Sequence, residues 1–270
     1  MNVAAATGVE HIERAFVRPK GENRLAVVIY LTVGYPDRAA TPDLLRAALD
    51  GGADVLELGV PFSDPLADGA TVQHANEVAL ADGVTLADCI AEARSIVAER
   101  DVSVLLMGYT NPFEQYGYDQ FALDAAPAGV AGVIVPDMPA EQSDVFDMEL
   151  DAVGMARIDL YAPTTPDARL ARLLPRSRGF VYCVSLTGVT GARRVLASDV
   201  ASFVSRVRAH TSLPVALGFG ISEPSHVSAL RGLVDGVVIG SAAIDAVTAA
   251  SDKPAALRTF VRSLVDAGRS

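Results

Sequence analysis

Two acidic residues, Glu57 and Asp68, lie in a segment whose pattern predicts a short strand followed by a constrained loop. Glu57 alternates with Leu56 and Leu58, so a strand here places its carboxyl group on the face opposite the two leucines. An acid that points into an apolar interior is costly to ionise and is retained mainly where a polar group, such as a substrate, meets it. The segment therefore indicates acid-base chemistry.

Asp68 follows Glu57 after a loop in which Pro61 and Pro65 restrict the backbone. Two carboxyl groups in different surroundings allow one to exchange protons while the other stays ionised. Each acid also has a simpler interpretation. Glu57 would be a structural buried acid paired with arginine, and Asp68 would cap a helix over residues 69–81.

Three glycine-containing loops form a second candidate site, and each follows an apolar run. They are SLTGVTG at 185–191, LGFG at 217–220 and IGS at 239–241. Glycine lets backbone N–H groups approach an anion closely, and a helix that begins after Gly240 would add its positive end and the Ser241 hydroxyl. The loops predict a phosphate site, although a single Gly-Ser pair is more often an ordinary helix cap.

Eight short apolar runs alternate with segments of helical periodicity, which predicts parallel strands joined by helices. Eight such units favour a single (β/α)8 TIM barrel over an open doubly wound sheet, with one domain over residues 1–270. Two additions are expected: a leading helix near residues 8–17, and a second helix between the second and third strands. The predicted strands are 26–32, 55–58, 104–107, 130–135, 156–160, 180–185, 214–217 and 236–239.

Composition excludes several classes of function. The net charge of −11 argues against a nucleic-acid partner. Cys89 and Cys183 support neither a disulfide framework nor a zinc site, and the four histidines lack metal-ligand spacing. No apolar run is long enough to span a membrane and the amino-terminus lacks a signal-peptide pattern, so a cytoplasmic location is expected.

The acidic residues are mostly aspartate, and Lys20 and Lys253 are the only two lysines among the 22 basic residues. We interpret this bias as adaptation to a salt-rich cytoplasm, which makes the protein halophilic. An ordinary solubilising excess of charge is the alternative.

Aromatic residues add two weaker candidates. Tyr182 lies on the predicted sixth strand, where its hydroxyl would reach the cavity or its ring would pack in the core. The stretch 109–117 follows the third strand and either forms a contact surface or packs locally under the next helix.

Taken together, these motifs resemble the alpha subunit of tryptophan synthase. The resemblance runs from about Gly8 to the end of the chain, and its diagnostic string is LELGVPFSDPLADG at 56–69. Supporting strings are LMGY at 106–109, TGVTG at 187–191, GFGI at 218–221 and GS at 240–241. The resemblance implies a (β/α)8 barrel that cleaves indole-3-glycerol phosphate, by a retro-aldol reaction, to indole and glyceraldehyde 3-phosphate.

By position, the resemblance implies that Glu57 is the general acid-base and that Asp68 is the partner of the indole N–H. It implies that Thr190, on a loop over residues 186–197, closes onto Asp68. The residues that match positions binding the rest of the substrate are Tyr182, Gly191, Gly220, Gly240 and Ser241. Neither a metal nor an organic cofactor is implied for this chain.

The resemblance also implies a partner, a beta subunit that carries pyridoxal phosphate (PLP), in an αββα heterotetramer. Asp64, Asn111 and Phe113 match positions that meet the beta subunit. Tyr30 and Leu186 depart from some relatives and leave the polarity of the pocket and the loop kinetics open. The alternatives are another sugar-phosphate barrel enzyme, or a non-catalytic phosphate-binding barrel subunit that activates a PLP enzyme.

Overall fold

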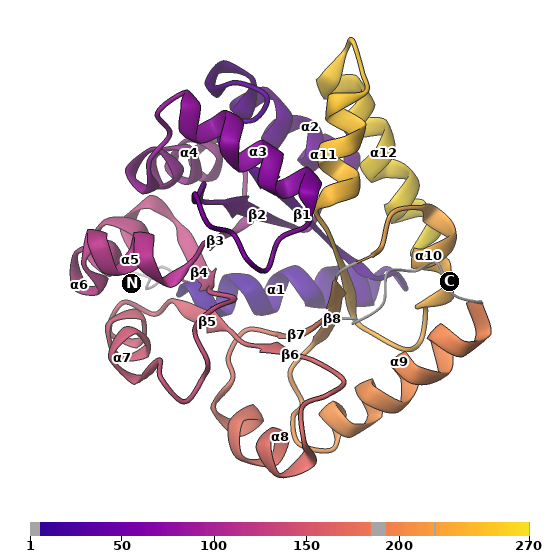
Figure 1. Cartoon of the computed structure of the whole chain (residues 1–270). Coiled ribbons are helices and arrows are strands. Elements are labelled where there is room, and N and C mark those ends of the chain that lie inside the picture. The colour runs from indigo at the N-terminus through magenta and orange to yellow at the C-terminus, as the bar shows by residue number, and fades with distance from the viewer. Residues whose placement is uncertain (1–5, 185–192, 219, 270) are drawn as a thin grey trace, which may run out of the picture.

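The computed structural model describes residues 6–184, 193–218 and 220–269, and its strands form one parallel sheet that wraps into a barrel (Figure 1). The order across the sheet is β5-β4-β3-β2-β1-β9-β8-β7-β6. The strands are β1 Ala26–Thr32, β2 Val55–Gly59, β3 Ser103–Met107, β4 Val130–Ile134, β5 Ala156–Ile158, β6 Leu160–Tyr161, β7 Val181–Val184, β8 Val215–Gly218 and β9 Gly236–Ile239.

The sheet closes because its two outermost strands, β5 and β6, are consecutive in the chain and only Asp159 separates them. The backbone N–H of Tyr182 on β7 donates to the carbonyl oxygen of Asp159 at 3.1 Å. The predicted eight-unit barrel is confirmed, except that its fifth strand is divided at Asp159 and that several strand ends differ by one residue.

Helices surround the barrel, and the two expected additions are present. The leading helix is α1, and α3 and α4 both lie between β2 and β3. None of the described helices is both long and apolar enough to cross a membrane. The helices are α1 Gly8–Gly21, α2 Thr41–Gly51, α3 Ala70–Ala81, α4 Leu86–Glu99, α5 Thr110–Tyr116, α6 Tyr118–Ala125, α7 Asp144–Ala152, α8 Asp167–Leu173, α9 Arg193–Arg208, α10 Pro224–Ala229, α11 Ser241–Thr248 and α12 Lys253–Ala267.

The leading helix α1 closes the amino-terminal end of the barrel and crosses the middle of the ring in Figure 1. Thr7 and Glu10 form a capping box at its start, which satisfies two free backbone N–H groups. Ile12 and Phe16 on α1 are buried in the inner core. A Cβ atom on Gly236, the first residue of β9, would lie 2.8 Å from the Phe16 ring, so glycine there lets the helix approach.

Side chains alternate between two apolar layers along each strand. On β2, Leu56 and Leu58 belong to the outer layer beneath the helices, whereas Val55 belongs to the inner layer. Glu57 shares the inner face with Val55 because alternate residues of a strand point the same way. The predicted direction of Glu57, opposite the two leucines and into the barrel, is therefore confirmed.

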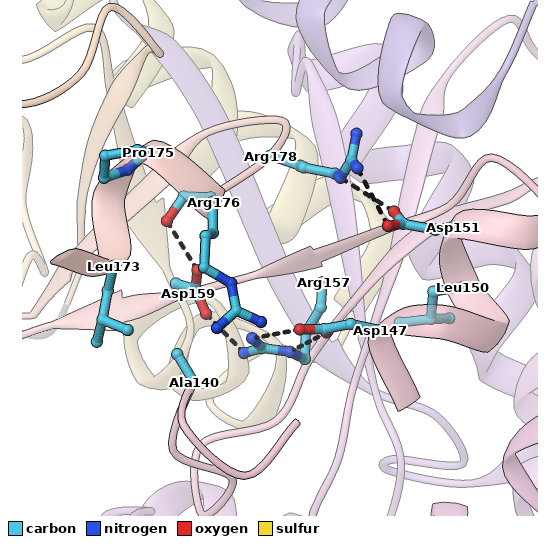
Figure 2. A pocket seen from close by; sticks show the side chains of 11 residues that line it. Ala140, Asp147, Leu150, Asp151, Arg157, Asp159, Leu173, Pro175, Arg176 and Arg178 are labelled. Carbon is cyan, nitrogen blue, oxygen red and sulfur yellow. Dashed lines mark hydrogen bonds and ion pairs between the residues drawn. The ribbon is translucent and has the colours of Figure 1, made fainter. Parts of the chain in front are cut away.

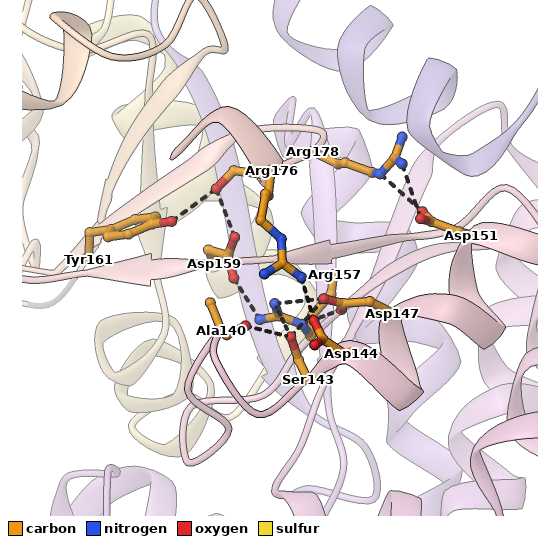
Figure 3. A network of polar contacts seen from close by, with 11 residues as sticks. Ala140, Ser143, Asp144, Asp147, Asp151, Arg157, Asp159, Tyr161, Arg176 and Arg178 are labelled. Atoms are coloured by element: carbon orange, nitrogen blue, oxygen red, sulfur yellow. Dashed lines mark hydrogen bonds and ion pairs between the residues drawn. The ribbon is translucent and has the colours of Figure 1, made fainter. Parts of the chain in front are cut away.

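A buried ionic cluster lies outside the barrel where the fifth strand divides (Figures 2 and 3). Arg157, 9% exposed, donates from Nε to Asp147 Oδ1 and from Nη1 to Asp159 Oδ1, both at 2.6 Å. Ser177 donates to the other oxygen of Asp159 at 2.7 Å. The cluster thus joins β5 to α7 and to the segment before β7, across the seam of the barrel.

The same region contains a cavity of about 330 Å³, which Figure 2 shows from close by. Arg176 pairs with Asp144, and Arg178 pairs with Asp151 at 3.0 Å. Because each of these arginines already has a carboxylate partner, we interpret the cavity as part of a structural cluster.

Candidate active site

A cavity of about 250 Å³ lies at the carboxyl end of the barrel, where the strand ends and the following loops converge. It brings together six of the eight predicted catalytic and substrate-binding residues. The other two, Thr190 and Gly191, lie outside the described residues. The lining residues are Tyr30, Glu57, Asp68, Gly69, Val72, Met107, Tyr182, Gly220, Ile221, Ser222, Val238, Gly240, Ser241, Ala242 and Asp245.

Glu57 is the middle residue of β2 and lies between Tyr30 of β1 and Leu105 of β3 in the sheet register. Its side chain is 1% exposed, and its Oε2 atom has no hydrogen-bond partner among the described residues. Burial, with a smaller contribution from the charge of Asp68, raises the pKa of Glu57 to about 8. In the part of the chain that the structure describes, no arginine pairs with Glu57, so the structural ion-pair interpretation is not supported.

Asp68 lies on the loop after β2 and is half-buried. Burial raises its pKa to about 6, and hydrogen bonds with Tyr109 and Asn76 act in the opposite direction. The N-cap of α3 is Gly69 rather than Asp68, and the helix has no side-chain cap. The alternative interpretation of Asp68 as a helix cap is therefore wrong, and its carboxylate is available to the cavity.

Two residues that support Asp68 were not predicted as site residues. The Tyr109 hydroxyl accepts a hydrogen bond from the Ala67 N–H at 3.0 Å, and its ring stacks on Phe62 with centroids 5.3 Å apart. Asn76 is 2% exposed on α3. Tyr109 lies two residues after the end of β3, a position that indicates a site residue in a barrel of this kind. A single asparagine inside a helix gives no such indication.

The described residues that were predicted to bind phosphate are two glycines and a serine of the cavity wall. Gly220 has φ +80°, a backbone conformation that favours glycine. Gly240 is the N-cap of α11, and Ser241 is the first helical residue, so its hydroxyl is not the cap. Free N–H groups at a helix start, with a hydroxyl beside them, are suited to an anion.

Two tyrosines line the cavity, and each lies against a glycine. A Cβ atom on Gly59 would lie 2.2 Å from the Tyr30 hydroxyl oxygen, and one on Gly218 would lie 2.3 Å from that of Tyr182. The Tyr30 hydroxyl also lies 3.1 Å from Oγ1 of Thr32. Burial raises the pKa of both tyrosines well above the usual value, so both present neutral hydroxyls.

The family model for the tryptophan synthase alpha chain matches residues 16–266. The chain belongs to this family. The resemblance drawn from the motifs is thus confirmed. The alpha chain from Roseiflexus castenholzii is 48% identical over 241 residues, which cover 88% of this chain and 92% of that relative. The alpha chain from Chloroflexus aggregans is 43% identical and covers 96% of this chain and 98% of its own length.

Solved structures of the family have the same fold. Tryptophan synthase from M. tuberculosis in an aminoacrylate- and BRD0059-bound form superposes with a TM-score of 0.87 at 33% identity, covering 96% of this chain and 98% of that one. The tryptophan synthase alpha subunit from Legionella pneumophila gives 0.88 at 34% identity, covering 95% and 97%.

The three residues matched to the family's partner contacts have different surroundings. Asp64 and Asn111 are exposed, and the Asp64 carboxylate accepts a hydrogen bond from Ser63 at 2.5 Å. Phe113 is fully buried and packs against Phe121, with ring centroids 4.9 Å apart. The prediction that Phe113 meets a partner is therefore wrong for its side chain. The aromatic stretch packs locally at this position because the ring fills the space under α6.

Proposed function

We propose that this chain is a carbon–carbon lyase, the alpha subunit of a tryptophan synthase, and that it cleaves indole-3-glycerol phosphate to indole and glyceraldehyde 3-phosphate. Membership of the alpha-chain family supports the reaction. The observation that carries the proposal is one cavity that is lined both by two acids of raised pKa, Glu57 and Asp68, and by the start of α11.

In this proposal Glu57 is the general acid-base. Its carboxylic acid protonates C3 of the indole ring, and the resulting carboxylate takes the proton of the side-chain hydroxyl. The bond between C3 and the side chain then breaks, its electron pair returns to the ring as indole, and the hydroxyl carbon becomes the aldehyde. The protonated Glu57 is regenerated, so no external proton donor is consumed.

Asp68 would stabilise the positive charge that develops on the ring nitrogen when C3 is protonated. A fixed carboxylate beside the N–H favours that charge most strongly in the transition state. This role requires Asp68 to be ionised while Glu57 carries its proton, and their pKa values of about 6 and about 8 fit that order.

The phosphate group would be held by Gly191, Gly220, Gly240 and Ser241, and Tyr182 would pack against the substrate. Thr190 would close onto Asp68 and exclude water. The roles of Thr190 and Gly191 rest on the motif alone. We propose that the whole chain, residues 1–270, acts as one domain.

We further propose that the chain acts in the cytoplasm within an αββα heterotetramer and that its acidic composition is halophilic. PLP belongs to the beta subunit of this family, and the alpha chain itself needs no cofactor. Asp64 and Asn111 are exposed and are the described candidates for the contact with the beta subunit.

The test is to incubate the purified chain with indole-3-glycerol phosphate and to assay indole, alone and with a beta subunit. We expect slow release of indole by the chain alone and faster release in the complex. Absence of indole under both conditions would reject the lyase and favour a non-catalytic subunit or another sugar-phosphate enzyme. Equal rates would reject only the activation by the partner.

A further inference from the structure

A third carboxylate, that of Asp245, lines the active-site cavity at the end assigned to the phosphate group. Neither lysine, arginine nor histidine lines this cavity among the residues that the structure describes, although a phosphate site is commonly basic. The described anion donors at this end are backbone N–H groups and the hydroxyls of Ser222 and Ser241. Within the described part of the cavity, the charged groups are therefore acidic where a dianion would bind.

The position of Asp245 follows from α11. It is four residues after Ser241, so the two side chains share one face of the helix about one turn, or roughly 5.4 Å, apart. Asp245 is exposed at the edge of the cavity. A phosphate at the start of α11 would therefore lie within about 10 Å of this carboxylate.

A hydrogen bond restrains the side chain of Asp245. Thr71 Oγ1 donates to Asp245 Oδ1 at 3.2 Å. Thr71 lies in the first turn of α3, three residues after Asp68. The same bond thus connects the phosphate-binding helix to the segment that carries the second acid.

We propose that Asp245 sets the affinity of this chain for the phosphate group of its substrate, and that its charge makes substrate binding stronger as salt concentration rises. This proposal rests on the proposed function, because it assumes that the anion binds beside Gly240 and Ser241. Asp245 opposes the bound dianion, while neutral N–H and hydroxyl donors hold it.

The physical reason is screening. Like charges repel over a distance set by the Debye length, which is about 10 Å at 0.1 M salt and about 3 Å at 1 M. A site built from lysine or arginine loses affinity for an anion as salt rises, because its attraction is screened. A site with an excess of carboxylates shows the opposite sign, because its repulsion is screened.

The experiment measures the dissociation constant of glycerol 3-phosphate by calorimetry at pH 7, in 50 mM and in 500 mM KCl, with the full chain. At this pH the ligand phosphate is mostly dianionic, since its second pKa is about 6. For the native chain we expect binding to be about two- to fivefold tighter at the higher salt concentration.

Asp245→Asn removes the charge and keeps an oxygen that can accept the hydrogen bond of Thr71. We expect it to bind glycerol 3-phosphate about three- to tenfold more tightly than the native chain in 50 mM KCl, and to gain little from added salt. Thr71→Val removes the tether and keeps the charge, so it should retain the native direction of the salt response.

Glu13→Gln is the matched control. Glu13 is an exposed acid on α1, at the opposite end of the barrel, so this variant loses one negative charge without touching the cavity. We expect native affinity and native salt response. An effect equal to that of Asp245→Asn would assign the salt response to net charge and would overturn the role of Asp245.

The outcomes separate this inference from the proposed function. Weaker binding of glycerol 3-phosphate at higher salt by the native chain, or an Asp245→Asn variant with native affinity and salt response, would overturn the inference while indole release stays intact. If the native chain releases no indole and does not bind glycerol 3-phosphate, the proposed function itself fails.

Discussion

At the scale of single residues, burial gives the two acids different pKa values. Glu57 is enclosed by the inner face of the barrel, whereas Asp68 lies on a loop where Tyr109 and Asn76 favour its ionised form. Both pKa values are raised, but that of Glu57 is raised further because its burial is more complete. Near neutral pH one acid can therefore donate a proton while the other remains charged.

This arrangement predicts the pH dependence of catalysis. We expect kcat/KM to rise as Asp68 ionises near pH 6 and to fall as Glu57 loses its proton near pH 8. Because the two acids interact, these limbs report on the pair. In Asp68→Asn the like charge is absent, so the alkaline limb should move to lower pH while the rate falls. An alkaline limb that stays in place would contradict the coupling between the two acids.

The sequence predicts the direction of the Glu57 side chain, because the residues of a strand alternate between its two faces. It missed the contacts of Asp68, because Tyr109 is 41 residues away in the chain and a pattern does not show which side chains the fold brings together. The predicted contact of the Phe113 side chain with a partner was wrong for a related reason. A family match gives the position of a residue but not the direction of its side chain.

At the scale of elements, the periodicity predicted the barrel, α1 and the second helix after β2. It did not predict the division of the fifth strand. Arg157 and Asp159 alternate with Ala156 and Ile158, and their side chains point outward into a buried ionic cluster instead of into an apolar layer. The sequence does not show that Arg157 and Asp159 are partners, because the second carboxylate that binds this arginine, Asp147, lies ten residues earlier on α7.

This cluster predicts a large loss of stability on Arg157→Met. The substitution leaves Asp147 and Asp159 without their main cation in a poorly solvated site, so we expect a loss of about 3–5 kcal/mol in the free energy of unfolding. Arg46→Met is the control, because Arg46 pairs with Glu99 on the surface and should lose only about 0–1 kcal/mol. Urea titrations of both variants measure the difference. Equal losses would show that the buried cluster contributes no more to the free energy of unfolding than a surface ion pair does.

At the scale of the whole molecule, the composition gives the net charge but not the effect of that charge on stability. The chain carries 33 acidic and 22 basic residues. Many arginines are used in pairs with aspartate or glutamate, which leaves a surplus of carboxylates to repel one another. Composition alone does not distinguish halophilic adaptation from an ordinary solubilising charge.

Salt dependence of stability distinguishes the two interpretations. If the acidic excess is halophilic, the melting temperature should rise by several degrees between 0.1 M and 2 M KCl, because screening weakens the repulsion among carboxylates. Thermal unfolding followed by circular dichroism measures this rise. A melting temperature that is unchanged or falls would favour the solubilising interpretation.

We propose that the buried Glu57 serves proton transfer at the expense of stability. Its pKa is raised from 4.5 to about 8 in the folded chain. The destabilisation is therefore absent below about pH 4.5, grows as pH rises, and is complete above about pH 8. Glu57→Gln removes the ionisable group, so it should unfold at a higher temperature than the native chain at pH 8, and at a similar temperature at pH 4.

The most direct test is the rate of indole release from indole-3-glycerol phosphate by Glu57→Gln, compared with the native chain at pH 7 under saturating substrate. Glutamine has nearly the same size but cannot exchange the proton, so we predict a loss of at least about 10²–10⁴-fold while glycerol 3-phosphate still binds. A folded variant that releases indole at a rate within a few-fold of the native chain would show that Glu57 is not the general acid-base.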